Sequence, residues 1–198
     1  MYLLELFVLA CSLLGCDSAV ESNHIPKLIS YDNLRGSNTE RICGSDIKVI
    51  DGDTIELQGN KFRLMCIDTP ESYYNGKKQY CLDNETDCGK LAKDAMEKLI
   101  AEELNKNGSI CCAWNKKDRY GRYLGWCGSS SGEPIIFNES INYDLIMNGY
   151  AWFYDGGNEC EILKSPFVKA KREKRGLFNE TLGGFQEPRL WRKIRSND

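Results

Sequence analysis

Hydrophobic and polar residues alternate in four stretches of the chain, at about residues 46–57, 61–67, 108–114 and 121–127. Alternation with a period of two is typical of a β-strand that buries one face. The dipeptide Gly59-Asn60 separates the first two stretches and predicts a hairpin turn between them. The pattern therefore predicts one strand pair early in the chain and a second pair on either side of residues 118–122.

Three other stretches have the apolar spacing of helices. In residues 88–104 the apolar side chains recur three or four positions apart with charged residues between them, which predicts an amphipathic helix. Residues 138–150 begin with an Asn or Ser cap and end at Gly149, and residues 165–178 end near Gly176. Strands, a helix, more strands and then helices give an α+β order, which a barrel of about five strands with about three packed helices accommodates.

The first 16 residues, MYLLELFVLACSLLGC, are mostly apolar. They are too few to span a bilayer and match the core of a signal peptide, so we expect residues 1–16 to be an export leader. No Lys or Arg precedes the apolar run and Glu5 lies inside it, which leaves a buried first helix as the alternative. The closing LLGC resembles a bacterial lipobox, in which case Cys16 would carry a lipid and attach the protein to a membrane.

Residues 17–42 are polar without a sustained period and predict a linker, so we expect a single folded domain over residues 43–198, as a monomer. The charge along the chain is uneven. Residues 161–198 hold ten Lys or Arg against five Asp or Glu, whereas the whole chain carries a net charge of −3. A basic face of this kind can follow a phosphate backbone, and a solvated helix surface is the alternative explanation.

The histidine and cysteine counts exclude several classes of enzyme. The single histidine, His24, lies in the polar linker, which argues against a histidine-based zinc site, a Ser-His-Asp triad or a Cys-His pair. Ten cysteines without a CxxC motif favour disulfides in an oxidising compartment over zinc. Four N-x-S/T triplets would be glycosylated only in a eukaryotic secretory pathway: Asn84, Asn107, Asn138 and Asn179.

Eight cysteines remain after Cys11 and Cys16, and two of their pairings follow from the predicted elements. We expect a Cys81–Cys88 bond that closes a polar loop ahead of the first helix. We also expect a Cys112–Cys127 bond, because the two residues should face each other across the second strand pair. The competing partner of Cys127 is Cys111, whose side chain should point to the opposite face. Four cysteines are left unassigned: Cys43, Cys66, Cys111 and Cys160.

Carboxylates and one arginine gather in the first strand pair. Within VIDGDTIEL, Asp51 and Asp53 are two residues apart, which would place them on one face of a strand. Pairing with the next strand brings Arg63 close, and Asp68 follows where that strand ends. Clustered carboxylates repel one another unless a cation or an arginine lies among them, so the pattern predicts a Ca²⁺ or Mg²⁺ site. Simple turn capping by Asp51 and Asp68 is the alternative.

Three ordered motifs resemble the staphylococcal nuclease family: DGDT at 51–54, FRLMCIDTPES at 62–72 and DRYGR at 118–122. An NGYA block at 148 and an RGLF block at 175 follow in the same order, so the resemblance covers about residues 45–192. Cys88-Gly89 and Trp191-Arg192 are similar to the secreted, cysteine-containing bacterial branch of the family.

The resemblance implies an OB-fold barrel that hydrolyses phosphodiester bonds in DNA and RNA with Ca²⁺ and little sequence specificity. It implies that Asp53, Asp68 and the backbone carbonyl of Thr69 bind the calcium ion, with Asp51 as a more distant acid. It further implies that Glu71 orients or deprotonates the attacking water, and that Arg63 and Arg122 hold the scissile phosphate. Tyr120 would donate a hydrogen bond to the phosphate, and Tyr154 would stack on a base.

Residue chemistry agrees with these implied roles. The phosphoryl oxygens gain negative charge in the transition state, and a divalent cation with two planar guanidiniums supplies positive partners for them. A glutamate can serve as the base where no histidine is present. The alternatives are a non-catalytic OB-fold module that binds nucleic acid or protein, and a surface lipoprotein with a structural role. The presence of all the acids together with both arginines favours catalysis.

Overall fold

A computed structural model describes residues 39–129 and 135–196 of the chain. The predicted leader, Cys16 and the linker up to residue 38 lie outside these ranges, as does most of the loop at 129–134. No helix in the two described ranges is long and apolar enough to cross a membrane.

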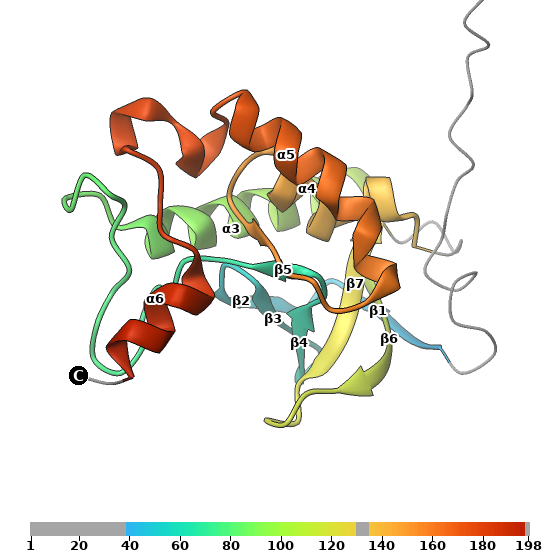
Figure 1. The fold of residues 1–198 in the computed structure, drawn as a ribbon. Coiled ribbons are helices and arrows are strands. Elements are labelled where there is room, and N and C mark those ends of the chain that lie inside the picture. The colour runs from blue at the N-terminus through green and yellow to red at the C-terminus, as the bar shows by residue number, and fades with distance from the viewer. Residues whose placement is uncertain (1–38, 130–134, 197–198) are drawn as a thin grey trace, which may run out of the picture.

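A six-stranded sheet with the strand order β1-β6-β7-β4-β3-β2 is the centre of the fold (Figure 1). Adjacent strands in this sheet are antiparallel, except for β4 and β7, which run parallel to each other. Its strands are β1 (Glu40–Gly44), β2 (Ile47–Asp51), β3 (Thr54–Leu57), β4 (Asn60–Leu64), β6 (Ile110–Lys117) and β7 (Tyr123–Ser129). A separate short pair consists of β5 (Ile67–Asp68) and β8 (Trp152–Phe153).

The α-helices of the described ranges are α3 (Cys88–Asn107), α4 (Ile141–Met147), α5 (Lys164–Arg172) and α6 (Pro188–Arg195). Short 3-10 helices are η1 (Phe137–Glu139), η2 (Asn158–Leu163), η3 (Gly176–Phe178) and η4 (Glu180–Leu182). In Figure 1, α3, α4 and α5 cover one side of the sheet, and α6 lies apart from them. The predicted α+β class is confirmed.

The described sheet has six strands, where four stretches and a barrel of about five strands were predicted. One added strand is β1, which begins at Glu40, in the stretch expected to be linker. The predicted strand at 46–57 is wrong, since the chain turns at Gly52 and Asp53 and divides it into β2 and β3. A side chain at Gly52 would lie 2.7 Å from Thr69 Oγ1, so the tight turn needs glycine for this close approach. Asp51 therefore ends β2 and Asp53 lies in the turn that follows, so the two do not share one face of a strand.

The predicted helices are present with different ends. The first is confirmed as α3, and Ser140 caps α4 by accepting a hydrogen bond from the Tyr143 N–H. The third ends at Arg172, and residues 176–178 form the separate helix η3. The hairpin turn between β3 and β4 falls at Gln58 and Gly59, one residue earlier than predicted; both have positive φ, 50° and 77°.

Both predicted disulfides, Cys81–Cys88 and Cys112–Cys127, are confirmed. The unassigned cysteines form Cys43–Cys111 and Cys66–Cys160. Adjacent residues of a strand point to opposite faces, so Cys111 and Cys112 link β6 to both of its neighbours, β1 and β7. The eight bonded cysteines give this domain covalent support that suits an oxidising environment.

One half-buried carboxylate outside the candidate site, Asp144, should make stability depend on pH. Burial, followed by the nearby carboxylates of Glu103 and Glu102, raises the pKa of Asp144 to about 6 from an ordinary value of 3.8. A raised pKa means that the folded state binds the proton more tightly, so this stabilisation is present below about pH 4 and is lost as the pH rises through about 6. The Asp144→Asn variant should therefore be more stable than the parent at pH 7.5, by about 1 kcal/mol after allowing for solvent screening.

Urea unfolding at pH 4 and at pH 7.5 measures this difference. The matched control is Glu85→Gln, an exposed carboxylate in the Cys81–Cys88 loop. A stability gain that is equal at the two pH values would show that Asp144 does not titrate as described.

Candidate active site

Arg63 joins two buried carboxylates at the centre of the site. Its Nη1 donates to Asp53 Oδ2 at 2.5 Å, and its Nη2 donates to Asp68 Oδ1 at 2.6 Å. Asp53 lies in the turn after β2, Arg63 on β4 and Asp68 at the end of β5, so three separate segments converge here. The carboxylate residues are only 4% and 1% exposed. The structure thus brings together an arginine and two acids that were predicted to be close.

Two neighbouring residues extend this network. The backbone N–H of Thr69 donates to Asp53 Oδ2 at 3.4 Å, which places Thr69 next to the carboxylate pair. Asp51 Oδ1 accepts from the backbone N–H of Gly52 at 2.8 Å and from the Ser72 hydroxyl at 2.5 Å. Burial, and then the Asp53 carboxylate, raises the pKa of Asp51 despite these hydrogen bonds. Ser72 is a contact that the sequence did not reveal.

Glu71 is held in place through its backbone. Its N–H donates to the side chain of Gln79 at 3.2 Å, and Gln79 in turn donates to the carbonyl of Gln186 at 2.8 Å. Gln79 is fully buried. Burial, and then the Asp53 carboxylate, raises the pKa of Glu71 to about 7. A carboxylate with a pKa near neutrality is well matched to proton transfer at neutral pH.

Gly89, in the first turn of α3, allows the helix to approach the backbone of Glu71. A β-carbon at Gly89 would lie 2.1 Å from the carbonyl oxygen of Glu71, a distance that requires the backbone to move. We expect Gly89→Ala to lower the free energy of unfolding by about 1–3 kcal/mol through overpacking and to lower turnover by displacing Glu71. Urea unfolding and steady-state kinetics measure the two effects.

The control for this variant is Glu97→Ala, at an exposed position of the same helix. Normal stability together with normal turnover in Gly89→Ala would contradict the idea that this close contact positions Glu71.

Arg122 lies at the end of the β6–β7 hairpin and is oriented by Asp118. Its Nε donates to Asp118 Oδ2 at 2.7 Å, and its Nη1 lies 3.5 Å from the hydroxyl of Thr54, next to Asp53. Burial acts to raise the pKa of Asp118, but the hydrogen bonds from Arg122 and from backbone N–H groups outweigh it and lower the pKa. Asp118 is therefore a positioning residue that the sequence analysis did not single out.

The two predicted tyrosines lie at the edge of the network. Tyr120 is 68% exposed on the same hairpin as Arg122, and its hydroxyl accepts a hydrogen bond from Arg119 at 2.7 Å. Tyr154 is 41% exposed and follows β8, where its N–H donates to the carbonyl of Cys66 at 2.9 Å. The ring of Tyr154 has Arg189 as a cationic neighbour, 6.0 Å from its centre. The side-chain partners of both tyrosines are arginines: Arg119 and Arg122 for Tyr120, and Arg189 for Tyr154.

Arg192 of α6 is the main site residue that the sequence analysis missed. Its Nη2 donates to Asp68 Oδ2 at 2.7 Å, and its Nη1 donates to Asp68 Oδ1 at 3.2 Å and to Glu71 Oε1. Trp191 before it is 4% exposed and packs against Tyr74, with 6.3 Å between ring centroids. The Trp191-Arg192 pair was noted in the sequence, but no local pattern tied it to residues more than 100 positions away.

The donor chemistry fits a hard divalent cation. Asp53, Asp68 and the carbonyl of Thr69 offer oxygen atoms of the type that Ca²⁺ prefers. In the structure, arginine side chains donate to both carboxylates, and the described residues hold no group of three or more His, Cys, Asp or Glu placed to bind a metal ion. Guanidinium groups thus balance the negative charge in this conformation.

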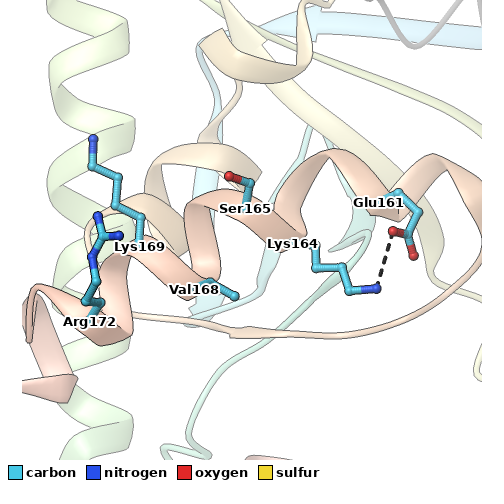
Figure 2. Close-up of a pocket in the computed structure, with 6 residues that line it drawn as sticks. All are labelled: Glu161, Lys164, Ser165, Val168, Lys169 and Arg172. Carbon is cyan, nitrogen blue, oxygen red and sulfur yellow. Dashed lines mark hydrogen bonds and ion pairs between the residues drawn. The ribbon is translucent and has the colours of Figure 1, made fainter.

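A separate hollow lies on the surface of η2 and α5 (Figure 2). It is lined by Glu161, Lys164, Ser165, Val168, Lys169 and Arg172. Figure 2 shows these side chains following the helix, with Lys164 paired to Glu161. None of the predicted site residues lines this hollow, so it is distinct from the carboxylate–arginine network.

Comparison with known proteins identifies the family of this chain. The family model described as "Staphylococcal nuclease homologue" matches residues 61–180. The chain belongs to the staphylococcal nuclease family. The matched range includes Arg63, Asp68, Glu71 and Arg122, whereas Asp53 and Arg192 lie on either side of it.

Three proteins with similar sequences cover different shares of this chain and have different names. An uncharacterised protein of Methanocaldococcus jannaschii is 30% identical over 88% of this chain and 90% of its own length. A protein of Escherichia coli O157:H7 named an uncharacterised endonuclease is 31% identical over 70% of this chain and 78% of its own. A succinoglycan biosynthesis protein of Rhizobium meliloti is 33% identical over 56% of this chain and 52% of its own. This staphylococcal nuclease family member therefore has a relative named as an endonuclease.

Proposed function

We propose that this protein is a calcium-dependent nuclease that hydrolyses phosphodiester bonds in DNA and RNA with little sequence specificity. The observation that carries the proposal is the ion network in which Arg63 bridges Asp53 and Asp68 while Glu71 lies beside them. Family membership and the relative named as an endonuclease support the same reaction class.

The proposed mechanism assigns each side chain a task. Asp53, Asp68 and the carbonyl of Thr69 would hold the Ca²⁺ ion, which when bound supplies positive charge next to the reacting phosphate. Glu71 accepts the proton of the attacking water as the general base. Arg63 and Arg122 bind the non-bridging phosphate oxygens and stabilise the charge that they gain.

The proposed substrate range follows from the kinds of groups available. Tyr120 would donate a hydrogen bond to a phosphate, and Tyr154 would stack on a base without reading its edge. Contacts to phosphates and ring faces are the same in DNA and RNA and carry little sequence information. We therefore propose that the enzyme cleaves both nucleic acids.

We also propose that the nuclease works outside the cytoplasm as a monomer. Four disulfides support an oxidising compartment. In this proposal residues 1–16 are the leader and residues 17–39 the linker. The nuclease domain then begins with β1 at Glu40, three residues before the predicted start at 43, and Cys16 is the residue that a lipid would modify.

Cleavage assays on the oxidised full-length protein test the proposal. Supercoiled plasmid DNA and a long RNA are incubated with the protein in Ca²⁺ and, separately, in excess chelator, with Asp68→Asn as the matched variant. We expect cleavage of both substrates in Ca²⁺ only, and strongly reduced cleavage by the variant. Binding of nucleic acid without cleavage, by folded protein in Ca²⁺, would contradict the proposal and favour the non-catalytic module.

A further inference from the structure

Arg192 and Arg63 both donate hydrogen bonds to the same carboxylate, Asp68. Asp68 Oδ1 accepts from Arg63 at 2.6 Å and from Arg192 at 3.2 Å, and Oδ2 accepts from Arg192 at 2.7 Å. The Asp68 side chain is 2% exposed, so water does not replace these partners easily. Both oxygens of this proposed calcium ligand are thus engaged by guanidinium groups.

Arg192 donates to both carboxylate oxygens of Asp68, and a cation bound at Asp68 would need one of them. Ca²⁺ binds carboxylate oxygens directly, at distances that leave no room for an N–H donor on the same lone pair. The cation and the guanidinium are both positively charged, so they would also repel each other when bound to the same carboxylate. Cation binding at Asp68 and the paired position of Arg192 therefore oppose each other.

The contacts that attach α6 to the domain are different from the contacts of the Arg192 side chain. Trp191 is buried beside Tyr74, and the carbonyl of Gln186 is held by Gln79, which anchors the helix to the domain. The side chain of Arg192 is 23% exposed, so its end reaches solvent on one side. Arg192 can leave Asp68 by a side-chain rotation. The helix then stays attached through Trp191 but loses the Arg192 contacts that hold its last turns against the domain.

We propose that Arg192 is a positioning residue that holds Asp68 and Glu71 in the cation-free enzyme and is displaced from Asp68 when the cation binds. Arg192 thereby sets the cation affinity of the site and couples cation binding to the last helix. This inference rests on the proposed calcium site, and it adds a residue on α6 that opposes occupancy of that site.

Calcium titration calorimetry without nucleic acid tests the inference, because it does not depend on turnover. We expect Arg192→Gln to bind Ca²⁺ about tenfold more tightly than the parent, because the cation no longer has to displace charge-assisted hydrogen bonds. Arg192→Lys keeps the charge but loses the bidentate contact with Asp68. Its affinity for Ca²⁺ should fall between those of the parent and Arg192→Gln. Circular dichroism verifies that each variant is folded.

Lys193→Gln is the matched control, because it removes the same charge from an adjacent, exposed position of α6. We expect its calcium affinity to change less than twofold, since general charge effects at the surface are weak. Equal tightening in Lys193→Gln and Arg192→Gln would overturn the inference. So would unchanged or weaker calcium binding in both folded Arg192 variants.

Hydrogen exchange of the peptide that contains residues 188–196 provides a second measurement. Affinity and conformational change are linked, so Ca²⁺ should increase exchange in this peptide of the parent protein and leave it unchanged in Arg192→Gln. Calcium binding with no exchange difference between the two proteins would overturn the coupling. Absence of calcium binding in every protein would instead disprove the proposed metal site, which is a distinguishable result.

Discussion

The Glu71→Gln variant is expected to cleave DNA about 100-fold or more slowly than the parent while binding nucleotide in Ca²⁺ normally. An amide cannot accept the proton of the attacking water, but its oxygen can still accept the hydrogen bond from Arg192. The backbone contact between Glu71 and Gln79 does not involve the carboxylate, so the local fold should be kept.

Single-turnover cleavage and calcium-dependent binding of a nucleotide, measured on the same preparation, separate chemistry from binding. Glu85→Gln is the control for loss of a carboxylate away from the network. A variant with unchanged turnover would remove Glu71 from the mechanism.

The Arg122→Lys variant is expected to lose about 100-fold or more in kcat although the positive charge remains. Asp118 holds the Arg122 guanidinium through Nε and Nη2, both at 2.7 Å, which leaves Nη1 directed toward Thr54 and the acidic turn. A lysine can pair with Asp118 or reach the phosphate, but it cannot do both with fixed geometry.

Steady-state kinetics with a short oligonucleotide should show the loss mainly in kcat and only weakly in KM, because the contact strengthens in the transition state. Arg172→Lys, an exposed position on α5, is the matched exchange at a remote site. Near-normal kcat in Arg122→Lys would show that Arg122 does not contact the transition state.

The sequence predicted the parts of the site that depend on neighbouring segments. Arg63 and Asp68 come from one motif, and Asp53 is ten residues from Arg63, so a strand pair was enough to bring them together. The error at 46–57 arose because Gly52 and Asp53 fit an alternating pattern, whereas the turn is set by the packing of Gly52 against Thr69 and Ala92. That packing cannot be inferred from a local pattern.

Contacts between distant segments account for what the sequence did not predict. The Cys81–Cys88 and Cys112–Cys127 bonds follow from a loop and a hairpin, with sequence separations of 7 and 15. Cys43–Cys111 and Cys66–Cys160 span 68 and 94 residues and depend on the positions of β1 and η2, which had no predicted element. The contact of Arg192 with Glu71 could not be predicted for the same reason, because the two residues are 121 positions apart in the sequence and α6 is short.

The Cys43–Cys111 bond also determines how the domain responds to mechanical load. β1 is an edge strand, and edge strands held by hydrogen bonds alone can be peeled from a sheet one pair at a time. Here a pull on the chain ahead of β1 passes at Cys43 into a covalent bond to β6, and Cys112–Cys127 carries it on to β7. The pairing of residues 40–42 with β6 would bear force before the three strands resist together.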